Sequence, residues 1–239
     1  MSPLKKIVEP FLKQTDAVLD EGYSAVLYGS LARGDHIPGW SDINLLLIVD
    51  HVDFDVLAAL VQPVAAWVKQ DAPPPLVMSR KEWGRSSDVF PIEITDMKTS
   101  YRVLRGMDPL DGLVVTKDSL RWTLERELRG TLNKLRQGYL PVGLRPEDLG
   151  RFVQESISSV VVLLRSLLAL TGKESRGGAR SVVDWAAALV GFNPAPLLRT
   201  LAARGPGRWS CGREEFEGYM LAVERTVTFV DELQPGDVE

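Results

Sequence analysis

The stretch LYGSLARGDHIPGWSDINLLL, residues 27–47, joins a glycine-serine turn to an acidic residue that precedes an apolar run. The residues SAVLYG (24–29) are rich in β-formers and end in glycine, which predicts a short strand closed by a sharp turn. DINLLLIVD (42–50) predicts a second strand, and its almost unbroken apolar run is typical of a strand covered on both faces. Asp42 and Asn44 would then share one face, because side chains alternate along a strand.

Gly29 and Ser30 form a turn of the kind that approaches phosphate closely. A glycine at the end of a strand lets backbone N–H groups come near a ligand, and a serine adds a hydroxyl at an expected helix start. The same pair is also a good turn and helix cap, so both interpretations stay open. Asp42 likewise suits either a metal ligand or a turn-capping residue, and Arg33 suits either a phosphate contact or a surface pair with Asp35.

The order of the polar residues within this stretch carries a family resemblance. Gly29-Ser30 is followed by Ala32-Arg33-Gly34 and then by Ser41-Asp42 at the start of the next predicted strand. Over about residues 20–96 the chain resembles the DNA polymerase β-like nucleotidyltransferase superfamily, whose pattern is Gly-Ser, commonly Ala-Arg-Gly, then Ser-Asp-x-Asp. The helical half more weakly resembles the C-terminal domains of bacterial antibiotic-type nucleotidyltransferases. The resemblance implies Mg²⁺-dependent transfer of a nucleoside monophosphate, AMP from ATP or its equivalent from another nucleoside triphosphate, to a hydroxyl acceptor.

The resemblance also implies a set of site residues. Asp42 matches the first metal-binding carboxylate, and Glu93, on a strand expected over residues 89–95, is the best match for the third and for a base. The second carboxylate is replaced by Asn44, whose neutral amide oxygen attracts Mg²⁺ less than a carboxylate does. Three outcomes stay open: a slow or one-metal enzyme, recruitment of Asp96 or another acid, and a catalytically silent regulatory protein that binds a nucleotide or a protein. The resemblance assigns nucleotide binding to Gly29, Ser30, Arg33 and Ser41, and metal binding to Asp42, Asn44 and Glu93.

Composition excludes several other classes of protein. His36 and His51 are the only histidines, so a zinc site with three histidine ligands is excluded, and any histidine-dependent triad would have to use one of these two. The single cysteine, Cys211, excludes an intramolecular disulfide and fits a reducing compartment, so we expect a cytoplasmic protein. A net charge of −4 argues against a basic nucleic-acid surface over the whole molecule. SVVVLLRSLLAL (159–170) is shorter than the ~20 residues of a bilayer span and contains an arginine, which indicates a buried helix.

Hydrophobic spacing predicts an α+β protein with two domains. Residues 1–118 would form a small mixed β-sheet flanked by helices, and residues 119–239 an all-α helical bundle. The apolar helical half would also suit pairing with a second copy. Besides the segments above, strands are expected at 75–79 and 112–116, and helices at 54–70, 119–137, about 147–170, 181–191, 195–204 and 213–233.

Overall fold

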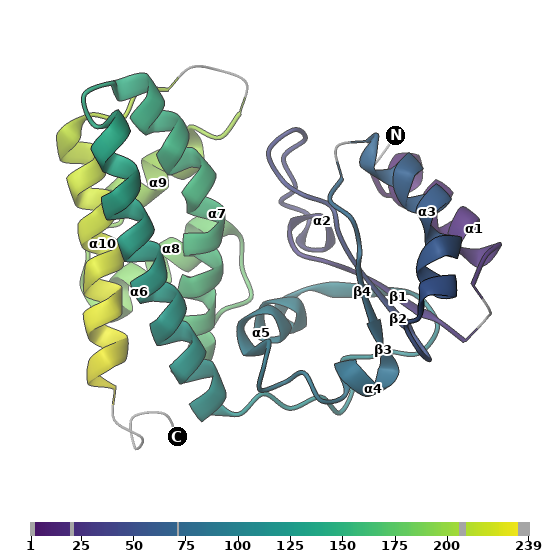
Figure 1. Ribbon diagram of the computed structural model, residues 1–239. Helices are drawn as coiled ribbons and strands as arrows, with labels where there is room; N and C mark the ends of the chain where they lie inside the picture. The colour runs from purple at the N-terminus through teal and green to yellow at the C-terminus, as the bar shows by residue number, and fades with distance from the viewer. Residues whose placement is uncertain (1–2, 20–21, 71, 206–208, 234–239) are drawn as a thin grey trace. The chain divides into compact units, whose positions relative to one another are not determined.

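The computed structural model describes residues 3–19, 22–70, 72–205 and 209–233, and Figure 1 traces the chain. The chain divides into two compact units. The first unit comprises residues 1–89 and 100–114, and the second comprises residues 90–99 and 115–239. The first unit carries the sheet, whereas the described part of the second is built from helices. An α+β fold with a mixed sheet followed by a helical bundle is therefore confirmed.

The sheet contains four strands in the spatial order β3-β2-β1-β4. β1 pairs with β2 and with β4 in the antiparallel sense, and β2 pairs with β3 in the parallel sense. The bounds are β1 (Ser24–Tyr28), β2 (Asn44–Val49), β3 (Leu76–Ser79) and β4 (Tyr101–Arg105). Strands were expected at the positions of β1, β2 and β3, and the structure has them there.

Helices α1 and α3 lie side by side and cover one face of this sheet (Figure 1). Their rings meet where Phe11 and Trp67 pack with centroids 4.7 Å apart. Leu45, Leu47 and Val49 belong to the same buried cluster, and the remaining leucine and isoleucine of β2 are buried as well, so this strand is covered on both faces. The helical elements of the first unit are a π-helical turn (Leu4–Val8), α1 (Glu9–Asp16), α2 (Ser30–Arg33), α3 (Phe54–Val68) and α4 (Arg80–Trp83).

The strand predicted over residues 89–95 is wrong, because this segment belongs to helix α5 (Pro91–Thr99) of the second unit. The alternation of isoleucines with polar residues that suggested a strand is too short to decide between strand and helix. Proline at the first helical position is favourable, since its missing N–H would have no partner there. The buried residues are Pro91, Ile92, Ile94, Asp96 and Met97, which are spread around the helix, so no single apolar stripe revealed its period.

The edge strand expected over residues 112–116 is also wrong, because these residues form a turn and an irregular segment that leads into α6. The edge position is taken by β4, which begins directly after Ser100. Two arginines in its sequence, YRVLR, obscured a strand whose edge position allows polar side chains to face solvent. One of them, Arg105, donates hydrogen bonds of 3.0, 3.2 and 2.9 Å to Asp16.

The second unit encloses its own core, to which α5 contributes Ile92. The helices of this unit that hydrophobic spacing predicted are all present, and the helix expected over residues 119–137 continues to Val142. Their bounds are α6 (Lys117–Val142), α7 (Pro146–Leu170), α8 (Ala179–Val190), α9 (Ala195–Ala202) and α10 (Arg213–Glu232). α7 is long and apolar enough to cross a membrane, but 67% of its most apolar stretch is buried inside the protein, as expected of a core helix.

Candidate functional site

The turn after β1 depends on the conformation of Gly29. This residue has φ +77° and ψ −152°, a region of backbone space that only glycine adopts readily. Helix α2 starts at the next residue, Ser30, and ends at Gly34 with φ +92°. The chain therefore reverses direction at the end of the strand without a side chain at its tightest point, as the sequence predicts.

Asn44 lies against this turn. It opens β2 directly opposite Tyr28, the last residue of β1. A Cβ atom added to Gly29 would lie 2.9 Å from Nδ2 of Asn44, which is closer than such atoms approach one another. Gly29 is therefore required for two reasons, its backbone conformation and the asparagine side chain that occupies the space beside it.

The loop between α2 and β2 is held in shape by two of the predicted binding residues. The hydroxyl of Ser41 accepts a hydrogen bond of 3.1 Å from the N–H of Ile37, and the N–H of Ser41 donates to the carbonyl of Ile37 at 2.8 Å. The Nε atom of Arg33 lies 3.5 Å from a carboxylate oxygen of Asp35, and only 15% of the arginine side chain is exposed. The structure thus contains the expected pair with Asp35, although the arginine side chain is mostly buried and not at the surface.

Asp42 is exposed and precedes β2, so strand alternation does not fix the direction of its side chain. The negative charge of Asp42 acts on His36, which lies in the same loop. Partial burial lowers the pKa of His36 below its ordinary value, and the carboxylates of Asp42 and Asp35 oppose this shift. The loop thus gathers an acid, a histidine and the glycine turn at one end of β1 and β2. The spacing of these residues in the sequence did not predict that His36 lies near Asp42.

Glu93 does not lie on the sheet. It occupies an exposed position in the first turn of α5, which belongs to the second unit. The first unit therefore brings together the predicted site residues other than Glu93. The expectation that a strand would carry this carboxylate beside the strand that follows Asp42 is wrong, because the segment is helical.

Asp96, considered as a substitute acid, is already paired inside the second unit. Its carboxylate lies 2.9 Å from Nε of Arg165 in α7, and both side chains are buried. Arg165 also donates to the carbonyl oxygens of Ser175 and Gly177 at 2.6 and 2.8 Å. The signal for this pair was present in the sequence, because an arginine inside an apolar helix needs a buried partner.

The carboxylates of the first unit provide few ligands for a metal ion. None of the four strands contains Asp or Glu, so the sheet itself supplies no acid. Within the described ranges, no group of three or more His, Cys, Asp or Glu side chains lies close enough to hold a metal. Asp42 offers a carboxylate and Asn44 an amide oxygen. Mg²⁺ commonly binds through one or two carboxylates plus substrate phosphates. These two residues could therefore hold the ion only when a bound phosphate group supplies further ligands.

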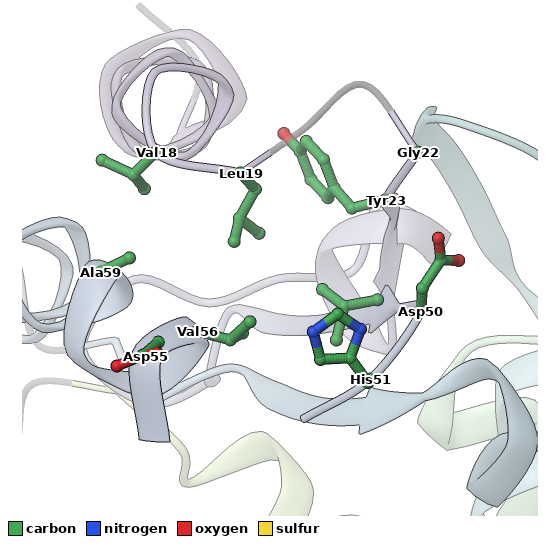
Figure 2. A pocket seen from close by; sticks show the side chains of 10 residues that line it. Val18, Leu19, Gly22, Tyr23, Asp50, His51, Asp55, Val56 and Ala59 are labelled. Atoms are coloured by element: carbon green, nitrogen blue, oxygen red, sulfur yellow. The ribbon is translucent and has the colours of Figure 1, made fainter. Parts of the chain in front are cut away.

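A cavity of about 310 Å³ lies at the opposite ends of β1 and β2 (Figure 2). Apolar side chains from the segment after α1, from β2 and from α3 form part of its wall, and Asp50, His51 and Asp55 contribute polar groups. Tyr23 also lines it, and its hydroxyl donates a 2.5 Å hydrogen bond to Asp16. The hydrogen bonds from Arg105 hold the pKa of Asp16 below its ordinary value. This cavity is separate from the Gly29 turn, since it follows the last residue of β2 whereas the turn adjoins the first.

Comparisons with known proteins agree with this architecture. Residues 5–98 match the family model of the nucleotidyltransferase domain. A search of curated protein sequences finds no match. Among solved structures, the chain is similar to spectinomycin adenyltransferase AAD(9) from Enterococcus faecialis, determined with ATP and spectinomycin, with a TM-score of 0.59 and 11% identity. The likeness covers 94% of this chain and 99% of that one, so the two share a fold along nearly their whole length.

Proposed function

We propose that the first unit binds a nucleoside triphosphate, ATP in the first instance, as the Mg²⁺ complex. The proposal starts from the match of residues 5–98 to the nucleotidyltransferase domain. The observation that carries the proposal is the Gly29 turn with Asn44 packed against it. A glycine turn leading into a helix exposes backbone N–H groups, which are natural partners of phosphate oxygens. Asp42 and Asn44 would hold the metal, and phosphate oxygens would complete its coordination.

Transfer of the nucleoside monophosphate to a hydroxyl is a second candidate function. It is favoured by the fold shared with an adenyltransferase whose structure holds ATP and an antibiotic acceptor. In this reaction the acceptor oxygen bonds to the α-phosphorus, the bond from that phosphorus to the β-phosphate oxygen breaks, and pyrophosphate leaves. The acceptor proton passes to a base, for which Glu93 stays the sequence-based prediction. Bound Mg²⁺ would neutralise charge on the phosphates and on the leaving group.

The composition of the sheet favours binding over transfer. Three carboxylates hold the two metals in the active members that this chain resembles, whereas here Asp42 is the first, Asn44 stands at the second position, and Glu93 lies on a helix of the second unit. An amide in place of a carboxylate removes a negative charge and weakens at least one metal site. With Asp42 and Asn44 as its metal ligands, the protein fits a regulatory role in which it binds a nucleotide without converting it.

Calorimetric titration of ATP, with and without Mg²⁺, tests the binding proposal. We expect Mg²⁺-dependent heat with the natural protein and a loss of at least about tenfold in affinity, equivalent to about 1.4 kcal/mol, with Asp42→Ala. Asp50→Ala is the matched control, because this exposed carboxylate lies at the other end of β2 and its pair with Arg80 is a surface contact. Equal affinities for Asp42→Ala and Asp50→Ala would place the nucleotide elsewhere.

Pyrophosphate release separates the two candidate functions on the same samples. Release by the natural protein in the presence of Mg²⁺, ATP and a panel of hydroxyl acceptors supports transfer. Binding without release, together with release gained in Asn44→Asp, supports a nucleotide-binding protein whose second carboxylate is missing. Absence of Mg²⁺-dependent ATP binding in the natural protein and in Asn44→Asp contradicts both.

A further inference from the structure

Helix α3 carries apolar side chains on two opposite sides. One side packs in the first unit through Leu60, Pro63 and Trp67, which are buried. The other side is exposed, and its two largest contributions come from Phe54 and Val61, which are 83% and 58% exposed. We call this exposed side the apolar stripe. It consists of Phe54, Leu57, Ala58, Val61, Ala65 and Val68.

The spacing of the apolar stripe is that of a helix-pairing surface. Apart from the adjacent Leu57 and Ala58, its members are three or four residues apart, so all of them lie along one side of the helix. A helix that is apolar all round is normally buried on all sides. A stripe of this kind, bordered by polar residues, marks a surface that contacts another protein.

The polar border of the stripe identifies that protein. Asp55, Gln62 and Lys69 follow one another at seven-residue intervals, so they line one edge of the apolar stripe, and all three are exposed. The edge begins with an acid, has a neutral amide in the middle and ends with a base. Rotation by half a turn about an axis through Val61 brings Asp55 of one copy to Lys69 of the other. Parallel pairing would instead put these edges on opposite sides of the interface, so Asp55 of one copy would not meet Lys69 of the other.

We propose that α3 pairs antiparallel with α3 of a second copy of this chain about a two-fold axis at Val61. The pairing is isologous, because the same surface serves both copies. Phe54 of each copy packs on Val68 of the other, Val61 packs on Val61, and the Asp55–Lys69 pair forms twice. The surface lies in the first unit rather than in the helical half, where the sequence favoured pairing. The proposal does not depend on nucleotide binding or transfer.

The size of the surface sets the expected strength of the dimer. A helix of this length is about 22 Å long, and pairing of one such helix from each copy buries less area than a typical stable complex. We therefore expect monomer and dimer in equilibrium at micromolar concentrations.

Sedimentation of the full chain between about 1 and about 100 µM tests the proposal. The natural protein should move from its monomer mass of 26.5 kDa towards twice that mass as concentration rises. Val61→Glu, which places two like charges on the axis, should stay monomeric. Ala66→Glu is the matched control, because Ala66 is exposed on α3 but outside the apolar stripe, and it should dimerise like the natural protein. Val61 is exposed, so equal melting temperatures for both variants confirm that they are folded.

Charge reversal tests the orientation of the pair. Asp55→Lys and Lys69→Asp should each weaken the dimer by about 5- to 30-fold, because each change affects two exposed pairs, and combining them should restore it. Oxidation of Val61→Cys should give a disulfide-linked dimer, whereas Ala66→Cys should give little, and the natural Cys211 is buried. A natural protein that stays monomeric throughout the range, or a double reversal that fails to restore the dimer, would overturn the proposal.

Discussion

The loop before β2 and helix α5 both carry acidic residues in a chain with few buried charges, but they use them differently. In the loop, Asp42 is exposed beside a partly buried histidine and a glycine turn. In α5, Asp96 is buried and bound to Arg165, which in turn holds two backbone carbonyls. A carboxylate available to a ligand must remain in contact with solvent, whereas a buried one must already have its partner. The loop therefore leaves a carboxylate open to the nucleotide proposed above, whereas the α5 pair is part of the structure of the second unit.

The largest expected effect comes from breaking the buried pair. Arg165→Met should reduce the free energy of unfolding by about 3–5 kcal/mol, because it removes the charged partner of the buried Asp96 carboxylate. Denaturation by urea measures this loss. Arg129→Met is the matched control, since Arg129 pairs with Glu125 and Asp231 at the surface, and it should cost about 1 kcal/mol or less.

A double variant shows whether the cost arises from the unpaired charge. Replacing Asp96 by leucine together with Arg165→Met should return much of the lost stability, because two apolar side chains substitute for the pair. If Arg165→Met proves no more costly than Arg129→Met, the contrast between a structural pair and a surface pair fails.

An intermediate effect is expected at the glycine turn. Gly29→Ala should destabilise the first unit by about 1–3 kcal/mol, because alanine resists this backbone conformation and its Cβ meets Asn44. It should also abolish the proposed ATP binding. Gly112→Ala is the control for backbone strain alone, since Gly112 has φ +69° but open space around it. In thermal unfolding, Gly29→Ala should have a lower melting temperature than Gly112→Ala. Adding Asn44→Ala to Gly29→Ala should raise the melting temperature part of the way back. Equal losses at the two glycines would show that Asn44 exerts no constraint.

The smallest effect concerns the charge in the loop. The pKa of His36 lies below its ordinary value because of partial burial, while Asp42 raises it. Asp42→Asn should therefore lower the His36 pKa further, and Asp50→Asn at the far end of β2 should leave it unchanged. NMR titration of the imidazole measures both, with His51→Gln used to assign the signals. Since the folded pKa is below the unfolded one, the stability contributed by neutral His36 is complete above the unfolded pKa and is lost as pH falls towards the folded value.

Regular patterns in the sequence predicted the elements whose apolar residues follow a helical spacing or an unbroken run. The leucines of α6 repeat at helical spacing, and β2 is an unbroken apolar run, so both elements were identified. α5 was missed because its buried residues surround it, and β4 because two arginines interrupt a strand at the edge of the sheet. In each case the packing of distant parts of the chain decided the structure, and a local pattern does not contain that information.

The candidate site was predictable where it depends on local backbone. Gly29 takes the conformation that a glycine at the end of a strand suggests, and α2 starts at Ser30 as expected. The contact of Asn44 with the turn and the proximity of His36 to Asp42 depend on strand register and on the path of the loop, which residue spacing alone does not specify. The strand expected to carry Glu93 proved to be a helix, so the assignment of this residue stays a prediction from the sequence match alone.

The chain leaves the sheet after residue 89, contributes α5 to the helical core, returns to form β4 and leaves again after residue 114. A protease that cut once in the irregular segment before α6 would therefore produce two fragments that remain associated. The N-terminal fragment would keep α5 embedded among α6 and α7, and the C-terminal fragment would supply Arg165 to Asp96. The nicked protein would behave as a split protein whose fragments stay together. Because the chain passes between the units more than once, no single cut separates one complete unit from the other, so neither fragment is a unit that recombination could transfer intact to another protein.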